Sequence, residues 1–91
     1  METKWFYTYV LFSLKDKRLY IGFTSDLKTR IIKHNEGLNT STKCRRPLKL
    51  ILAEAFINEK DARVREKFYK SGRGREVLKK KLENTFFDFE K

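Results

Sequence analysis

The chain has 91 residues, which is enough for one domain with a single, modest hydrophobic core. Lys and Arg (22) outnumber Asp and Glu (12), and the net charge of +10 favours nucleic acid or an anionic membrane as partner. The single cysteine excludes an intramolecular disulfide, and no apolar run is long enough to span a bilayer. No signal-like or basic amphipathic terminus supports export or membrane attachment, so we expect one cytoplasmic domain over residues 1–91.

Two strands of a hairpin are predicted at the start of the chain. Residues 5–11 and 18–24 are rich in aromatic and β-branched side chains and flank a polar turn. With an even number of residues in the connection, Tyr9 would share a face of the sheet with Tyr20 and Gly22; an odd number would separate them. Gly22 leaves a space where another backbone or a phosphate can approach closely.

A helix is predicted to begin after a Ser-Asp capping pair and to end at Gly37. Leu27 and Ile31 form its buried stripe. At ~100° per residue, Arg30 and His34 lie within about 60° of that stripe, as neighbours one turn apart. We therefore expect both side chains where the edge of this helix meets the sheet.

The rest of the chain predicts a basic loop, a third strand and two helices. The loop covers residues 38–47, the strand covers 48–57, and the next helix starts at Asn58. Residues 71–74 (Ser-Gly-Arg-Gly) break that helix before a short basic helix over 75–82. The aromatic and acidic tail is compatible with packing on the domain and with disorder. The element order is β-β-α-β-α-α, which belongs to the α+β class.

Five side chains supply the groups that phosphodiester cleavage needs: Tyr9, Tyr20, Arg30, His34 and Glu66. The reaction requires a group that activates water, a cation on the phosphate and a ligand for a divalent metal. Each residue alone has an ordinary structural explanation, such as a strand aromatic, a solvated arginine or a carboxylate paired with a lysine one turn later. The ordered set and its spacing indicate chemistry.

Tyr7-Thr8-Tyr9, Tyr20-Ile21-Gly22, Arg30, His34-Asn35-Glu36-Gly37 and Glu66 stand in the order of the motifs of one known family. The chain resembles the GIY-YIG nuclease superfamily, and most of all its small stand-alone bacterial members, which are related to the N-terminal nuclease domain of a bacterial excinuclease. The resemblance covers the core of the domain, roughly residues 5–82. One departure is visible, because only the final tyrosine of the Gly-Ile-Tyr motif is kept.

The resemblance implies a small three-stranded antiparallel sheet flanked by helices. It also implies that Tyr9, helped by Tyr20, activates the attacking water. Arg30 and His34 would contact the phosphate, and Glu66 would bind Mg²⁺ or Mn²⁺. A phenol with a pKa near ~10 is a poor base at pH 7, so a nearby metal ion or arginine would have to stabilise the phenolate.

A group of basic residues in and after the loop predicts a phosphate-binding patch: Lys43, Arg45, Arg46 and Lys49. The sequence thus favours a metal-dependent endonuclease that cleaves DNA in repair or recombination, with RNA still open as a substrate. The alternative is a non-catalytic DNA- or RNA-binding module that retains the fold. A protein-interaction domain would leave the charge of +10 unexplained, so no protein partner is predicted.

Overall fold

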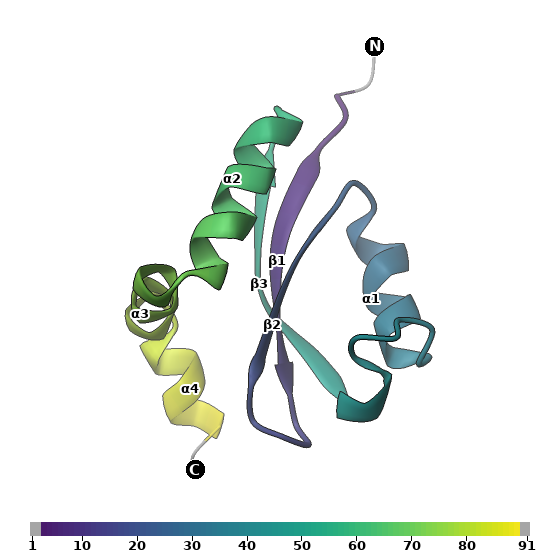
Figure 1. Ribbon diagram of the computed structural model, residues 1–91, viewed down its shortest axis with the longest axis vertical. Helices are drawn as coiled ribbons and strands as arrows, with labels where there is room; N and C mark the ends of the chain where they lie inside the picture. The colour runs from purple at the N-terminus through teal and green to yellow at the C-terminus, as the bar shows by residue number, and fades with distance from the viewer. Residues whose placement is uncertain (1–2, 90–91) are drawn as a thin grey trace.

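The computed structural model describes residues 3–89. They form a three-stranded antiparallel sheet with the strand order β2-β1-β3 and four α-helices, so the predicted α+β class is confirmed (Figure 1). The order adds one helix, α4, to the predicted series. The elements are β1 (Phe6–Ser13), β2 (Leu19–Thr24), α1 (Leu27–Asn35), the 3₁₀ turn η1 (Lys43–Arg45), β3 (Leu48–Phe56), α2 (Glu59–Lys70), α3 (Gly72–Lys81) and α4 (Glu83–Phe89).

An even number of residues lies between the last paired residues of β1 and β2, which places Tyr9 and Tyr20 on the same face of the sheet. Phe12 pairs with Leu19, which leaves an even number of residues in the connection, and Tyr9 stands directly opposite Gly22. Tyr20 is two positions before Gly22 on β2, so it lies on the same face of the sheet as Tyr9. β1 is the central strand, and its residues from Thr8 to Ser13 are all buried.

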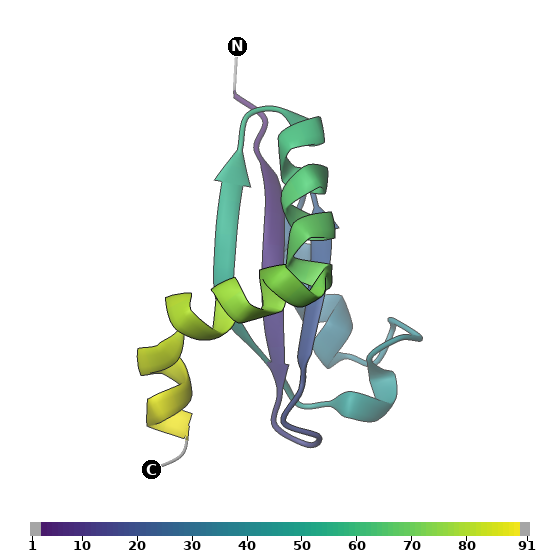
Figure 2. The same cartoon turned by 60° about the vertical axis from the view of Figure 1, so that its left-hand side comes forward.

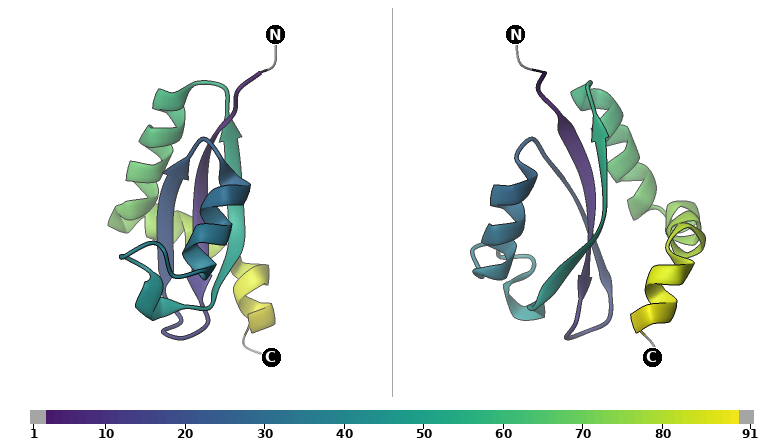
Figure 3. Two further views of the ribbon diagram at one scale, coloured as in Figure 1. Left: turned by 90° about the vertical axis from the view of Figure 1, so that its right-hand side faces the viewer. Right: turned by 180° about the vertical axis from the view of Figure 1, so that it is seen from behind.

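The helices cover the two faces of the sheet unequally. α1 and η1 lie on one face, whereas α2, α3 and α4 lie on the other (Figures 1 and 3). Figure 2 shows α2 along the sheet, with α3 crossing the strands from the lower end of α2 and α4 lying beyond β3. The core between the sheet and α2–α3 is apolar: Val10, Ile21, Tyr69, Leu78 and Leu82. The opposite face has a smaller cluster around Tyr9 and Leu11, and its layer contains a buried histidine.

The first helix begins and ends as its sequence predicts. The Asp26 side chain accepts a hydrogen bond from the Thr29 amide (3.2 Å), and Gly37 adopts a positive φ of 78° just after the helix. The predicted stripe of Leu27 and Ile31 packs against the cluster of Tyr9, Leu11 and Leu48, but both residues are half-buried and His34 is the fully buried residue of α1. The imidazole is therefore more deeply buried than the aliphatic pair.

The predicted break after α2 is a junction between two helices. The Ser71 hydroxyl accepts a hydrogen bond from the Gly74 amide (3.0 Å) and caps α3, which begins at Gly72 and not at residue 75. Gly74 lies so close to the Phe68 carbonyl that a methyl group would overlap it. The serine and the second glycine therefore start the next helix where the pattern predicts an interruption.

The aromatic tail forms α4 and packs on the domain, which decides between the two possibilities left open by its sequence. The Phe89 ring stacks on Phe12 with 4.7 Å between centroids, and Phe86 lies 6.2 Å from the same ring. Among residues 3–89, no helix has the length and apolar character needed to cross a membrane.

Candidate active site

Tyr9 reaches across the edge strand because Gly22 has no side chain. The two residues face each other across β1 and β2, and a methyl group at position 22 would overlap the ζ carbon and the hydroxyl of Tyr9. The sequence predicts a close approach at Gly22 by a backbone or a phosphate. The structure places the ring of Tyr9 there, which brings its hydroxyl toward the outer side of β2, one of the two edge strands of the sheet.

A chain of buried hydrogen bonds starts at this hydroxyl. The Tyr9 oxygen lies 2.9 Å from Nε2 of His34, and Nδ1 of His34 lies 2.7 Å from Oγ1 of Thr42. All three side chains have no exposed surface. In one tautomer Tyr9 donates to Nε2 while Nδ1–H donates to Thr42; in the other Thr42 donates to Nδ1 while Nε2–H donates to Tyr9. The chain can therefore carry a proton in either direction.

Burial keeps both members of this pair neutral. Desolvation, followed by the neighbouring phenol of Tyr20, raises the pKa of Tyr9 to about 12, although Arg30 acts in the opposite direction. Desolvation, followed by the positive charge of Arg30, lowers the pKa of His34 from its ordinary value of 6.5. Near pH 7 the site thus holds a protonated phenol and a neutral imidazole, one nitrogen of which has a lone pair that accepts a hydrogen bond. Tyr9 alone is a weak base, but His34 can accept its proton.

Arg30 is the positively charged residue that acts on the pKa of both Tyr9 and His34. It is half-buried on α1. No carboxylate pairs with Arg30 in the part of the chain that the structure describes, whereas Arg45, Arg63 and Arg65 each have one. A half-buried guanidinium without a counter-charge is suited to an anionic oxygen from outside the protein.

The ring of Tyr20 packs beside those of Tyr9 and His34. Its ring centroid lies 5.1 Å from that of His34 and 6.4 Å from that of Tyr9. The side chain is half-buried, and its hydroxyl has no hydrogen-bond partner within residues 3–89. This hydroxyl is therefore available to a water molecule or a phosphate oxygen.

Glu66 approaches the cluster from the other layer. It lies on α2, one turn after Arg63, whose guanidinium stands 4.1 Å from the ring centroid of Phe23 on β2. This side of α2 therefore faces the edge strand, and the charge of Glu66 raises the pKa of Tyr9. Glu66 also pairs with Lys70 at 2.9 Å, which is the ordinary helical contact expected from its spacing. Its side chain is 19% exposed and thus lies at the margin of the site.

Comparison with known proteins identifies the family. The model of the GIY-YIG catalytic domain matches residues 5–82 of this chain. The chain belongs to the GIY-YIG family. This membership points to the nuclease superfamily and to nucleic acid as the class of substrate.

Several small proteins of similar length are similar in sequence to this GIY-YIG chain. It is 42% identical over 77 residues to a UPF0213 protein in the ldhD 5' region of Pediococcus acidilactici, covering 81% of this chain and 78% of that protein. It is 41% identical over 71 residues to the UPF0213 protein YazA of Bacillus subtilis, covering 77% and 71%. The solution NMR structure of a UPF0213 protein from Bacillus halodurans matches with a TM-score of 0.51 and 35% identity over 81% of each chain.

The departure from the GIY-YIG motif at Thr8 has a structural explanation. Thr8 is buried on the α2 side of β1, and its hydroxyl donates a hydrogen bond to the carbonyl of Ala62 (2.6 Å). This contact satisfies the buried hydroxyl and links the central strand to α2. Threonine can therefore take the place of isoleucine without changing the position of Tyr9.

The predicted phosphate-binding residues of this GIY-YIG domain do not form one continuous surface. Lys43 and Arg46 are exposed in and after η1. Arg45 is held by Asp16 (2.6 Å), whose pKa this contact lowers to about 2, and it also donates to the Leu19 carbonyl. Lys49 pairs with Phe12 on β1 and lies 5.4 Å from the ring centroid of Phe89, so it is on the opposite face of the sheet from Tyr9. Their role in binding phosphate stays a prediction.

Two positioning residues were not recognised from the sequence. Thr42 holds His34 from a segment in which neighbouring Thr and Ser residues look equivalent, so no sequence signal distinguishes it. The Asn35 side chain exchanges two hydrogen bonds with the backbone of Leu48, at 3.1 and 3.0 Å, and fixes the end of α1 to the start of β3. Both contacts keep the imidazole against the sheet.

Proposed function

We propose that this GIY-YIG protein is a metal-dependent endonuclease that hydrolyses phosphodiester bonds in DNA. The observation that carries the proposal is the half-buried, unpaired guanidinium of Arg30 beside the hydrogen-bonded pair of Tyr9 and His34. This combination offers a site for a phosphate oxygen and, next to it, an acceptor for the proton of a water molecule.

In this mechanism Arg30 binds the non-bridging oxygens of the scissile phosphate and offsets the charge that builds up on them. The attacking water lies against the half-buried Tyr20, and in this proposal it reaches the hydroxyl of Tyr9, which is completely buried in the free protein, when the bound DNA opens the site. As the water attacks, Tyr9 takes its proton and passes its own proton to Nε2 of His34, while Thr42 stabilises the imidazole at Nδ1. The high pKa of Tyr9 is no obstacle to this relay, because no free phenolate has to accumulate.

Glu66 is the proposed ligand for Mg²⁺ or Mn²⁺. A single carboxylate suits such an ion when substrate phosphate oxygens and water complete its coordination. The ion would supply charge stabilisation at the leaving oxygen. Among residues 3–89, no three His, Cys, Asp or Glu side chains gather as a metal site, so this proposal depends on the substrate to complete the ligand set.

A non-catalytic DNA- or RNA-binding module is the second candidate. The ion pair between Glu66 and Lys70 favours it, because this pair leaves the proposed metal ligand occupied in the free protein. The charge of +10 suits either function.

Nicking of a supercoiled plasmid separates these functions. Purified protein with Mg²⁺ or Mn²⁺ should nick the plasmid, EDTA should prevent it, and Arg30→Ala should abolish it. Lys28→Ala, at an exposed position of the same helix, is the matched control for lost positive charge. Metal-independent binding without any cleavage would support the binding module instead. A role in repair or recombination and a cytoplasmic location stay predictions.

A further inference from the structure

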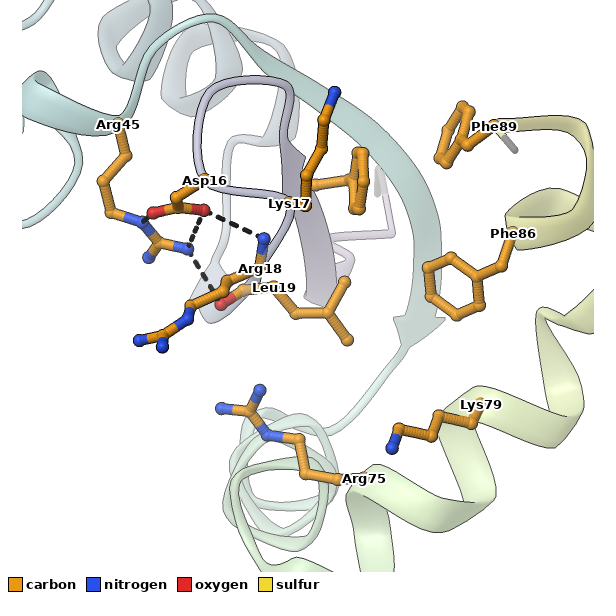
Figure 4. A pocket seen from close by; sticks show the side chains of 10 residues that line it. Asp16, Lys17, Arg18, Leu19, Arg45, Arg75, Lys79, Phe86 and Phe89 are labelled. Carbon is orange, nitrogen blue, oxygen red and sulfur yellow. Dashed lines mark hydrogen bonds and ion pairs between the residues drawn. The ribbon is translucent and has the colours of Figure 1, made fainter. Parts of the chain in front are cut away.

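A hollow of about 1180 Å³ opens at the hairpin end of the sheet, between the β1–β2 connection and helices α3 and α4 (Figure 4). Two of its lining residues, Phe12 and Leu19, face each other across β1 and β2. Their register places them on the opposite side of the sheet from Tyr9. This hairpin hollow is therefore separate from the candidate active site.

The rim of the hairpin hollow is strongly basic. Five of its ten lining residues are Lys or Arg, and the single acid, Asp16, is already paired with Arg45. Arg18, Arg75 and Lys79 have no carboxylate partner within residues 3–89. Figure 4 shows these three cationic groups around the opening. The hollow thus attracts an anion with more than one charge or more than one anionic group.

The wall of the hairpin hollow is aromatic. Phe86 and Phe89 of α4 line it together with the buried Phe12 and with Leu19. Both α4 rings contact Phe12, at 6.2 and 4.7 Å between centroids, and both remain half-buried, so part of each ring is open to the hollow. Aromatic rings beside unpaired cations are the combination that binds single-stranded nucleic acid: bases stack on the rings, and phosphates contact the cations.

We infer that the hairpin hollow binds an unpaired nucleotide of a DNA strand, with its base against Phe86 and Phe89 and its phosphates on Arg18, Arg75 and Lys79. A base in a duplex is stacked on both sides and cannot reach such a wall, so the site selects a single-stranded segment. The choice of DNA rests on the proposed function. The inference adds a substrate class to it, namely DNA in which an unpaired strand or flap adjoins the cleaved bond.

The position of the hollow fits a strand that also enters the active site. Leu19 lines the hollow, and its neighbour Tyr20 belongs to the catalytic cluster on the other face of the same edge strand. Arg45 also lines the hollow, and it comes from the segment that carries Thr42 to His34. A strand that passes around the outer edge of β2 can therefore occupy both sites.

Fluorescence anisotropy with a labelled oligodeoxythymidylate in EDTA measures this binding without cleavage. The double variant Arg75→Ala/Lys79→Ala should weaken binding roughly tenfold or more and flatten the slope of log K against log salt by up to about 2. Arg73→Ala/Lys80→Ala is the matched control, because it removes the same charge from exposed positions of the same helix outside the hollow. It should retain most of the affinity.

Phe86→Leu tests the aromatic wall, since it keeps an apolar side chain and removes the ring. It should weaken binding of the oligonucleotide by roughly 5- to 100-fold and leave binding of a blunt duplex unchanged. Circular dichroism establishes that the variant is folded; should it unfold, the charge variants decide alone.

Equal losses in the two double variants would overturn the inference, as would a wild-type protein that does not bind the oligonucleotide. Displacement of the oligonucleotide by dTMP at comparable concentration would also overturn it, since the hollow would then be a site for a free nucleotide. Hollow-dependent binding by a protein that never cleaves would refute the proposed function alone. Metal-dependent cleavage with unaltered binding in the hollow variants would refute this inference alone.

Discussion

The hydroxyl of Tyr9 on β1 lies 2.9 Å from Nε2 of His34 on α1, and both side chains are completely buried. At rest the proton belongs to the phenol, because the pKa of Tyr9 is raised and that of His34 is lowered. In the proposed reaction Tyr9 therefore acts as a relay between the water and the imidazole. The resemblance gives water activation to Tyr9, helped by Tyr20, and the proposed relay adds His34 as the group that receives the proton.

Tyr9→Phe tests the relay. The variant keeps the ring over Gly22 but removes the hydroxyl, so the rate of single-turnover cleavage should fall by roughly 10²–10⁴. The lost partner of His34 should also lower the free energy of unfolding by about 1–3 kcal/mol. Tyr20→Phe should cost less rate and almost no stability, because its hydroxyl has no partner within residues 3–89. A larger loss in Tyr20→Phe would exchange the two roles.

The protonation state of His34 can be measured directly. It is the single histidine of the chain, so its imidazole NMR signals need no assignment, and their midpoint should lie below pH 6.5. The folded state then binds fewer protons than the unfolded state. The unfolding free energy should be at its full value above about pH 6.5 and fall as the pH drops through the folded pKa. Tyr9, Tyr20, Arg30 and Thr42 are the polar or charged groups that act on or contact this ring.

Denaturant unfolding across this pH range checks the stability effect, and His34→Gln should flatten the pH dependence. A midpoint at or above 6.5 would show that burial does not lower this pKa. A midpoint above about 7 would leave most of the imidazole charged at neutral pH, without a lone pair for the proton of Tyr9, and would contradict the relay.

Thr42→Val tests the far end of the hydrogen-bond chain. The substitution keeps the shape of the side chain but leaves Nδ1 of His34 without a partner, which should cost about 1–3 kcal/mol of unfolding free energy. Cleavage should slow as well, because no side chain then accepts a hydrogen bond from Nδ1–H when Nε2 takes the proton of Tyr9. Thr42→Ser should restore both properties. Thr40→Val, at an exposed position of the same loop, is the matched control; equal effects at both positions would show that Thr42 has no special contact.

Local patterns predict the strand and helix order but not the partners of buried polar groups. Parity in the hairpin is enough to bring Tyr9, Tyr20 and Gly22 to one face, since strand residues alternate strictly. The full burial of His34 depends on Thr42, eight residues later, whose position depends on how the loop returns to the sheet. The spacing of apolar residues along the sequence does not reveal this contact between His34 and Thr42.

The basic residues illustrate the same limit. Lys49 follows the loop closely in sequence, but strand pairing with Phe12 directs it to the face of α4. Arg45 is tied to Asp16 of the hairpin connection, a contact between distant segments. The fold of the tail is also set by a distant partner, because α4 packs through Phe89 on the central strand. In each case the missing information is a tertiary contact.

Substitution of Arg45 and substitution of Arg46 should therefore have different effects on DNA binding and on stability. Arg46→Ala removes an exposed charge near the active-site face, so binding to all DNA sequences should weaken similarly and the slope of log K against log salt should flatten by about 1. Arg45→Ala should mainly reduce stability, because it breaks the contacts with Asp16 and with the Leu19 carbonyl. Salt titrations of binding and thermal melts of both variants measure these effects. An unchanged slope in Arg46→Ala would show that this residue does not contact the DNA backbone.

The metal-binding role of Glu66 is separable from its ion pair with Lys70. Glu66→Gln removes the carboxylate charge but keeps the length of the side chain, so Mg²⁺-dependent cleavage should be abolished while DNA binding in EDTA remains nearly intact. Lys70→Gln breaks the same ion pair and leaves the carboxylate in place. Because the pair is largely exposed on the lysine side, either substitution should change the unfolding free energy by less than about 1 kcal/mol.

The two variants should therefore agree in stability and disagree in cleavage, with Lys70→Gln retaining activity. Titration of Mg²⁺ and Mn²⁺ into single-turnover reactions measures the difference, since a lost ligand raises the metal concentration that any residual activity requires. If Glu66→Gln cleaves at the wild-type rate and with the wild-type metal dependence, Glu66 is only the helical partner of Lys70. The metal would then have to be held by the DNA phosphates and by Tyr20 or Tyr9, and the proposed division of roles in this cluster would have to be rebuilt around the phenols.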